Sequence, residues 1–282
     1  MEVAEVLREL GGVATRAALV AATDRGTVDR ALAGGSIEVL ARGRYALPEV
    51  EGAVAAAHRL AGALCLTSAA LHHGWAVKTV PDRPHVAVPR NRRAPAHARA
   101  HVHYLDVPPG SIVLDEVATL AHCLRRLPFD EALAVADPAL RAGEDTALRQ
   151  AAALARGPGS KQVRRVAGLA RAEAANPFES VLRAIALGVS GLRVEPQVLI
   201  TSVEPWCRPD LVDRELRIVL EADSFEWHGG RAALARDARR YNLLVVDGWL
   251  VLRFAWEDVM LDPCYVGSVL RAAVAERAQR RP

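Results

Sequence analysis

The stretch RPDLVDRELRIVLEADSFEWHGG, residues 208–230, gathers carboxylates into a pattern typical of a β-hairpin. Two apolar runs with alternating polar residues meet at Arg214-Glu215, where we expect the turn. A turn at that point places Asp210 opposite Val219 on the neighbouring strand. Asp210 then lies one diagonal step from Glu221 on the same face of the sheet, close enough for the two carboxylates to share one ion.

Asp223, two residues beyond Glu221, points to the same face. Like charges held together in this way are unfavourable unless a cation is present. Ligand sets made only of oxygen suit Mg²⁺ or Mn²⁺, so we predict that Asp210, Glu221 and Asp223 bind one of these ions. Such an ion polarises a phosphodiester and activates water. The alternative is a charged strand end that Arg208 and Arg217 neutralise.

Helices and strands follow one another around this hairpin in a recognisable order. Asn176 and Pro177 predict the start of a helix that ends at Gly188, and a strand carrying Gln197 follows it. After the hairpin come the helix RAALARDARRYNLLVVDG, the strand WLVLRFAWEDV and a last helix. The order α-β-β-β-α-β-α predicts a mixed sheet flanked by helices.

The spacing of the acids resembles the PD-(D/E)XK nuclease superfamily, in which Asp is followed on the adjacent strand by Glu-x-Lys. Pro209-Asp210 and Glu221-Ala222-Asp223 fall on these positions, with Asp223 where the superfamily has lysine. The motifs RPD, FEWH, ARDARRYNLL and GWLVLRF over residues 176–259 resemble more closely the very short patch repair endonuclease and its relatives. The resemblance implies a restriction-endonuclease-like fold and hydrolysis of DNA.

The hairpin geometry and the resemblance together give a candidate site. Its catalytic residues are Asp210, Glu221, Asp223, His228 and Glu179, and its supporting residues are Gln197, Asp237 and Arg240. On the resemblance, Asp210 would bind the metal and His228 would act near the scissile phosphate. Asp237 and Arg240 would brace the site from the helix, and Glu179 would match the helix glutamate of the family.

The chain also departs from the repair enzyme. The enzyme's threonine-histidine pair falls on Ala222 and Asp223, its zinc ligands are not reproduced, and no lysine follows Lys161. Arginines of the helix, or His228, would therefore have to supply the positive charge that faces the phosphate. Mismatch specificity is not carried over.

Residues 1–48 combine three short helix patterns with a hairpin, the order of a winged helix-turn-helix. Thr15 and Thr27 are expected to cap the second and third helices. Basic and acidic residues balance here, so a grip on DNA would rest on Arg42 and Arg44, on either side of the hairpin turn. The alternative is a winged helix that contacts protein or is purely structural.

Residues 49–156 read as a middle α/β domain in which two strands enclose a basic loop. The stretch 83–105 holds arginines and histidines and no acid. Arg90, Arg92 and Arg93 are therefore candidates for contacts to phosphate. A solvated hairpin loop explains the same composition equally well.

The composition of ARGPGSKQ, residues 155–162, is that of a linker, so we expect the nuclease-like domain to cover residues 161–282. The front half of the chain resembles the winged-helix domain of type IV antitoxins of the abortive-infection kind. The stretch VLDEVATLAHCLRRLPFDEALAVADPALR resembles the second domain of that architecture.

Length and composition are those of a globular protein of two or three domains, since 51% of the 282 residues are apolar. No apolar run reaches membrane length and no secretory leader is visible, which predicts a cytoplasmic protein without a membrane partner. The four cysteines lie far apart and are expected to be free thiols. The net charge of +3 permits nucleic-acid binding without arguing for it.

The sequence therefore predicts an α+β protein with an N-terminal winged helix-turn-helix, a middle α/β domain and a C-terminal restriction-endonuclease-like sheet. One hypothesis is a Mg²⁺- or Mn²⁺-dependent DNA endonuclease or nickase with a winged-helix reader. The other is a DNA-binding transcriptional regulator of the type IV antitoxin kind whose nuclease-like domain is inactive. DNA is the expected partner in both, and a homodimer is left open.

Overall fold

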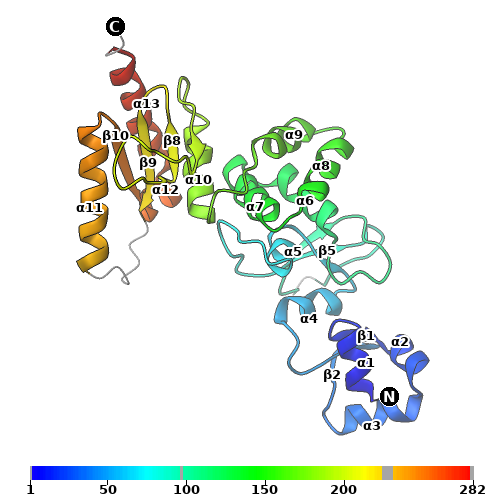
Figure 1. The fold of residues 1–282 in the computed structure, drawn as a ribbon. Coiled ribbons are helices and arrows are strands. Elements are labelled where there is room, and N and C mark those ends of the chain that lie inside the picture. Colours follow the sequence, from blue (N-terminus) through cyan, green and yellow to red (C-terminus); the bar gives the residue numbers. More distant parts are fainter. Residues whose placement is uncertain (1, 96–97, 224–230, 280–282) are drawn as a thin grey trace. The chain divides into compact units, whose positions relative to one another are not determined.

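The computed structural model describes residues 2–95, 98–223 and 231–279, and it is α+β, as predicted (Figure 1). The chain forms two compact units: the first is Met1–Gly74 with Val80–His122, and the second is Trp75–Thr79 with Cys123–Pro282. Within the described ranges, no helix is both long and apolar enough to cross a membrane.

The first unit begins with three short helices and a three-stranded antiparallel sheet of order β1-β3-β2. The elements are α1 (Val3–Glu9), β1 (Val13–Thr15), α2 (Arg16–Ala22), α3 (Arg25–Ala33), β2 (Glu38–Ala41) and β3 (Arg44–Ala46). Leu7, Leu19, Val28 and Tyr45 are buried together and form the core that holds the helices on the sheet.

The helix caps in this region are partly as predicted. Thr15 caps α2, because its hydroxyl accepts a hydrogen bond from the Ala18 amide. The prediction that Thr27 caps α3 is wrong. The carboxylate of Asp24 accepts from the Thr27 amide at 2.9 Å, so the helix begins earlier, at Arg25. Aspartate and threonine are both favoured at this position, so the sequence alone does not show which of the two caps the helix.

The rest of the first unit is built around a second sheet, of order β4-β5-β6, in which β5 and β6 run parallel. Its elements are α4 (Gly52–Arg59), β4 (Ala63–Leu64), α5 (Leu66–His72), β5 (His85–Val88) and β6 (His101–Tyr104). Helix α6 (Glu116–Arg126) starts in the first unit and ends in the second.

The second unit opens with α7 (Phe129–Arg141), α8 (Asp145–Leu154) and α9 (Ser160–Leu169), followed by α10 (Pro177–Ala186). Asn176 caps α10 and Pro177 takes its first turn, as the sequence predicts. Helices α8 and α9 pack on one another within this unit, on either side of the stretch whose composition suggested a linker.

A buried ion pair fastens α10 to α7. Nη2 of Arg183 lies 2.7 Å from both carboxylate oxygens of Asp137, and both side chains are almost completely buried. The same carboxylate accepts hydrogen bonds from the Ser180 hydroxyl and from the Arg171 amide. Nη1 of Arg183 donates a hydrogen bond to the carbonyl of Leu169. Asp137 therefore joins α7, α10 and the segment after α9.

The remaining elements form a four-stranded mixed sheet of order β10-β9-β8-β7. They are β7 (Glu195–Pro196), β8 (Leu211–Asp213), β9 (Ile218–Asp223), α11 (Arg231–Val246), β10 (Leu250–Ala255), α12 (Trp256–Leu261) and α13 (Pro263–Gln279). β9 is parallel to β10 and antiparallel to β8. The observed order α-β-β-β-α-β, completed by α12 and α13, agrees with the prediction except that Trp256–Leu261 is helical.

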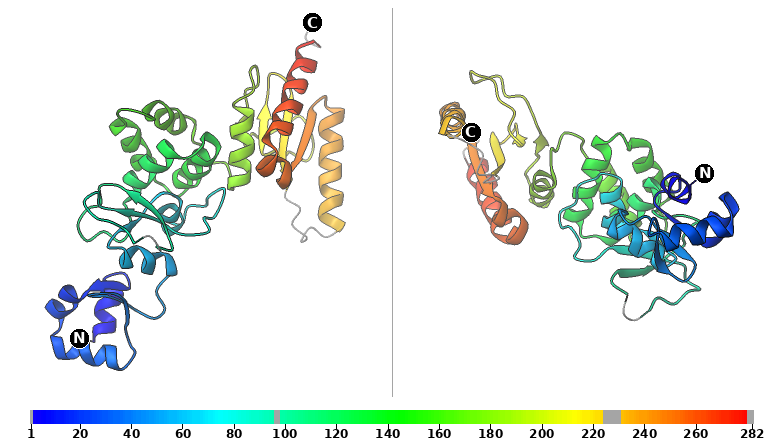
Figure 2. Two further views of the ribbon diagram at one scale, coloured as in Figure 1. Left: turned by 180° about the vertical axis from the view of Figure 1, so that it is seen from behind. Right: turned by 90° about the horizontal axis from the view of Figure 1, so that it is seen from below.

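The two faces of this sheet are covered by different helices (Figures 1 and 2). Ile218 and Leu220 are buried with residues of α10, α12 and α13. Val212 and Val219 are buried on the opposite face with Leu244 of α11. Because side chains alternate along a strand, the residues that share a face with Val219 look toward α11.

Replacing Arg183 by Met should destabilise the second unit by about 3–5 kcal/mol, because it leaves the Asp137 carboxylate buried without its charge partner. Chemical denaturation followed by circular dichroism measures this free energy of unfolding. Arg193→Met is the matched control, because Arg193 pairs with Glu215 at an exposed position, where loss of the pair should cost about 1 kcal/mol or less. Equal effects of the two substitutions would contradict the role given to Asp137.

Candidate functional site

The hairpin register differs from the predicted one. β8 and β9 pair Leu211 with Leu220, Val212 with Val219 and Asp213 with Ile218. Continuing this register by one residue places Asp210 directly opposite Glu221, whereas the sequence predicted Val219 as its partner.

The physical reason is a longer turn than expected. Residues 214–217 all lie outside the strands, and the Asp213 carboxylate closes the turn by accepting a hydrogen bond from the Leu216 amide at 2.8 Å. Arg217 completes it with a positive φ of 51°. The two carboxylates thus come closer together than the predicted diagonal arrangement would bring them.

Asp210 and Glu221 form an interacting pair of buried carboxyls on the face that looks toward α11. Asp210 Oδ2 accepts a hydrogen bond from the Ala222 amide at 2.8 Å, which fixes its carboxylate at the edge of β9. Burial is the largest cause that raises the pKa of Asp210. Burial, and then the charge of Asp210, raise the pKa of Glu221 to about 8. Both carboxyl groups therefore hold a proton more tightly than they would in water, and the two titrate as a coupled pair.

Gln197 links this pair to the helix before the sheet. Its Nε2 lies 3.3 Å from Asp210 Oδ1 and 3.5 Å from Glu179 Oε2. Gln197 has a positive φ of 53°, a backbone conformation that few residues with side chains adopt. The side chain is thus aimed between two carboxyls by an unusual backbone turn.

Glu179 lies in the first turn of α10 and is buried. Its carboxylate accepts hydrogen bonds from the Ala175 amide at 2.9 Å and from the Asn176 side chain at 3.0 Å. Burial raises the pKa of Glu179, and the charge of Asp210 raises it further. Glu179 therefore closes the start of α10 and borders the carboxyl pair at the same time.

Positive charge comes to the pair from α11. Arg240 Nη2 lies 3.2 Å from Glu221 Oε1 and 3.8 Å from Asp237 Oδ1. Its guanidinium stacks on the Tyr241 ring, 4.8 Å from the centroid. The contact with Glu221 lacks hydrogen-bond geometry, so the buried Oε1 accepts no hydrogen bond from the described residues. The positive charge of Arg240 acts against the effects of burial and of Asp210 on Glu221, because it lowers the pKa of that carboxyl.

Asp223 interacts with β10 and not with the Asp210–Glu221 pair in the described contacts. It forms an ion pair with Arg253 of β10, and both side chains are about 40% exposed. The Arg253 guanidinium also lies over the Tyr241 ring, 4.5 Å from the centroid. Over the described residues, no group of three or more His, Cys, Asp or Glu side chains has an arrangement that could hold a metal ion. The predicted role of Asp223 as a third ligand remains a prediction.

The structure therefore brings together six of the predicted residues: Glu179, Gln197, Asp210, Glu221, Asp237 and Arg240. The predicted catalytic residue His228 lies outside the described residues. Tyr241 was not predicted. Asp237, Arg240, Tyr241 and Leu244 recur at helical spacing, and this periodicity could have identified Tyr241 as part of the inner face of α11.

The arginines predicted to bind DNA occupy two places in the first unit. Arg42 is exposed at the turn between β2 and β3, and Arg44 is half-buried on β3. Arg90, Arg92 and Arg93 are exposed after β5, and Arg90 lies 3.6 Å from Asp106. The structure does not gather these five side chains into one cluster of hydrogen bonds or ion pairs.

Comparisons with known proteins give little information on function. No family model matches the chain. Uncharacterised proteins of two Mycobacterium tuberculosis strains are 31% identical to it over 93 residues. The match covers 33% of this chain, which spans about a third (34%) of the length of these relatives.

A crystal structure of the RV2827C protein from Mycobacterium tuberculosis resembles the chain with a TM-score of 0.30 and 17% identity. That match covers 66% of this chain and 74% of the other. A likeness of this extent carries no conclusion about either fold family or function.

In the absence of divalent ions, the second unit should lose stability as the pH rises from about 4.5 to about 8. The pKa of Glu221 is raised in the folded state, so folding retains a proton that the unfolded chain has already released. Glu221→Gln should remove this dependence and be relatively more stable at pH 8, by at least ~1.4 kcal/mol, the equivalent of one pKa unit.

Denaturant titrations at several pH values, with chelator present, measure this difference. Glu257→Gln, an exposed carboxylate in the same unit, serves as control and should keep the slope of the wild type. A wild-type slope that persists in Glu221→Gln would show that Glu221 is ionised throughout this range.

Proposed function

We propose that the second unit is a divalent-metal-dependent nuclease that cuts or nicks DNA, and that its sheet with flanking helices is a restriction-endonuclease-like domain. The observation that carries the proposal is the buried cluster of Glu179, Asp210 and Glu221, joined through Gln197 and faced by Arg240. Carboxyl groups with raised pKa values that converge in one place are more typical of a working site than of a solvated strand end.

The donor set fits a hard divalent cation. The pair itself offers only carboxylate oxygens, and Glu221 Oε1 is buried without a hydrogen bond from the described residues. Asp210 and Glu221 would hold Mg²⁺ or Mn²⁺, and Glu179, which Gln197 joins to Asp210, is a further carboxylate beside them. When bound, such an ion supplies polarisation of a phosphodiester and activation of water.

The surrounding residues position this pair. The Ala222 amide and Gln197 hold Asp210 through one oxygen each, which leaves the Glu221 oxygen next to Arg240 as the less constrained donor. Tyr241 supports both Arg240 and Arg253 by stacking. These two guanidiniums are paired with Glu221 and Asp223, and they would offset phosphate charge in a chain without a lysine at this point.

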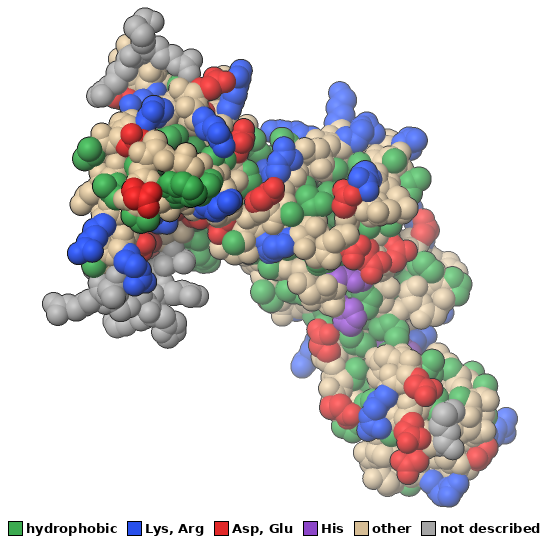
Figure 3. All heavy atoms as spheres, in the orientation of Figure 1, with side chains coloured by type: hydrophobic (Ala, Val, Ile, Leu, Met, Phe, Trp, Pro, Cys, Tyr) green, Lys and Arg blue, Asp and Glu red, His purple; other side chains and the backbone are tan. Residues whose placement is uncertain are grey.

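DNA recognition is assigned to the first unit, whose three helices and small sheet have the element order of a winged helix-turn-helix. On the face drawn in Figure 3, basic and acidic side chains are interspersed over both units. A grip on DNA would therefore depend on local contacts from α3 and from Arg42 at the exposed turn between β2 and β3.

A second candidate is a transcriptional regulator whose nuclease-like unit is inactive. One observation favours it: the residue in the lysine position, Asp223, is acidic and is paired with Arg253. In that case the buried carboxyls would have no catalytic role and the first unit alone would act on DNA.

The purified protein should convert supercoiled plasmid to relaxed or linear DNA only when Mg²⁺ or Mn²⁺ is present. Asp210→Asn keeps the shape of the side chain and an acceptor for the Ala222 amide but removes the charge, so cleavage should fall to background. Gel electrophoresis of plasmid measures this, with Glu257→Gln as a variant that loses one exposed carboxylate.

Cleavage that survives in chelator or in Asp210→Asn would refute the site. A wild-type protein that binds duplex DNA but leaves it intact with either ion would support the regulator instead.

Arg42→Gln should weaken duplex binding and flatten its salt dependence. Each phosphate contact contributes about 0.9 to the slope of log affinity against log salt concentration, so loss of one contact should lower the slope by about that amount. Fluorescence anisotropy across a salt series measures the slope. Arg126→Gln removes one exposed charge from the second unit and should leave it unchanged.

A further inference from the structure

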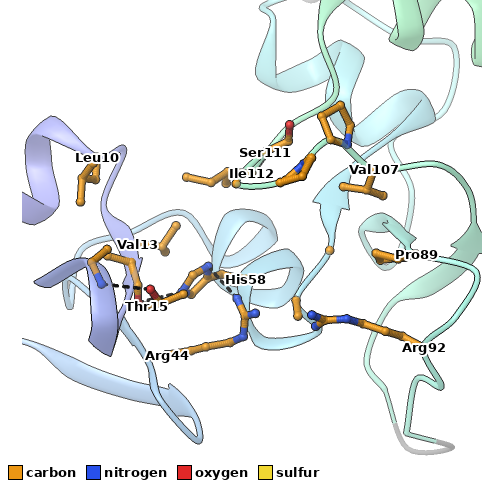
Figure 4. Close-up of a pocket in the computed structure, with 17 residues that line it drawn as sticks. Leu10, Val13, Thr15, Arg44, His58, Pro89, Arg92, Val107, Ser111 and Ile112 are labelled. Carbon is orange, nitrogen blue, oxygen red and sulfur yellow. Dashed lines mark hydrogen bonds between the residues drawn. The ribbon is translucent and has the colours of Figure 1, made fainter. Parts of the chain in front are cut away.

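A pocket of about 470 Å³ lies within the first unit, where the helices and sheet of residues 1–48 meet the part that follows (Figure 4). One wall comes from β1, the start of α2 and β3. The opposite wall comes from Pro89 and from residues 107–112. Leu10, Val13, Val107 and Ile112 give it apolar surface, and the hydroxyls of Thr15 and Ser111 add polar groups. This size and mixture are typical of small-molecule sites.

Two arginines reach into this pocket from segments far apart in the sequence. Arg44 comes from β3 and Arg92 from the loop after β5, and Figure 4 shows their guanidinium groups turned toward one another. Burial, and then the charge of Arg92, lower the pKa of Arg44. None of the pocket's lining residues is acidic, and neither arginine forms an ion pair with a described carboxylate.

His58 holds Arg44 in place and does not neutralise it. Arg44 Nη1 lies 3.4 Å from His58 Nδ1, and His58 Nε2 lies 2.9 Å from the Ala14 carbonyl. If Nδ1 accepts from the arginine, Nε2 carries the hydrogen and donates to the carbonyl, which is the neutral imidazole. Burial lowers the pKa of His58, in agreement with this state. The His58 side chain is buried, and its contact with Nη1 positions the Arg44 guanidinium.

The pocket thus holds two positive charges and no lining carboxylate that would balance them. Each presents a planar set of donors that matches the oxygens of a phosphate. A dianionic phosphate between them would balance both charges, and an attached apolar group would cover the surface of Pro89, Val107 and Ile112.

We propose that the pocket binds a small phosphate monoester with an apolar or aromatic body, with the phosphate between Arg44 and Arg92. A phosphate of the DNA backbone is the less suitable occupant, because the site is a concavity with apolar walls. This site is independent of the proposed nuclease activity and lies in the other unit.

Isothermal titration calorimetry of the full-length protein with 1-naphthyl phosphate tests this proposal. We expect saturable binding with one site per chain, and much weaker binding of inorganic phosphate and of uncharged 1-naphthol. Arg44→Gln and Arg92→Gln should each weaken binding about tenfold or more, since each removes charge-assisted hydrogen bonds. The matched controls Arg42→Gln and Arg93→Gln each remove a neighbouring arginine that does not line the pocket. Both controls should bind 1-naphthyl phosphate as tightly as the wild type does.

Thermal melting of all four variants establishes that they remain folded. The proposal is overturned if 1-naphthyl phosphate does not bind, if 1-naphthol binds equally well, or if the pocket variants and the control variants behave alike. It is also overturned if Arg44→Gln and Arg92→Gln weaken binding of duplex DNA but not of 1-naphthyl phosphate, since the two arginines would then be contacts to the DNA backbone.

Discussion

The buried ion pair between Asp137 and Arg183 is the contact on which the second unit depends. A carboxylate inside a protein is tolerated only when its charge and its lone pairs are all met, and Asp137 obtains this from Arg183, Ser180 and the Arg171 amide. These three partners hold α10 and the segment before it in one position against α7. Since Glu179 lies one turn before Arg183 on α10, the same contact determines where Glu179 meets the sheet.

A second set of contacts then brings the acids together. Hydrophobic residues of β9 alternate between the two faces of the sheet, so Glu221 can point toward α11 only because Leu220 and Ala222 pack on the other side. The burial that stabilises this sheet is also the largest cause of the raised pKa values of Asp210 and Glu221. Stability and site chemistry thus come from one packing arrangement, and Arg240 with Tyr241 offsets its electrostatic cost.

Much of this arrangement could be predicted from the sequence, and the exceptions have physical reasons. The order of elements followed from apolar periodicity and from caps such as Asn176-Pro177, which are local signals. The predicted register of the hairpin was wrong, because the observed register depends on the hydrogen bond by which Asp213 closes a longer turn. The meeting of Arg44 with Arg92 could not be predicted, because it depends on how two separate parts of the first unit pack. The roles of His228 and Asp223 remain predictions.

The short segment Trp75–Thr79 prevents the two units from being separated by truncation of the chain. It belongs to the second unit although the chain on both sides of it belongs to the first, and Lys78 is tied there to Asp130 at 2.6 Å. The polypeptide therefore passes between the units three times. No single stop codon or new start codon separates them cleanly, because any truncation that isolates one unit removes a piece of that unit or retains a piece of the other. Functions of the two units are accordingly best separated by point substitutions within the intact chain.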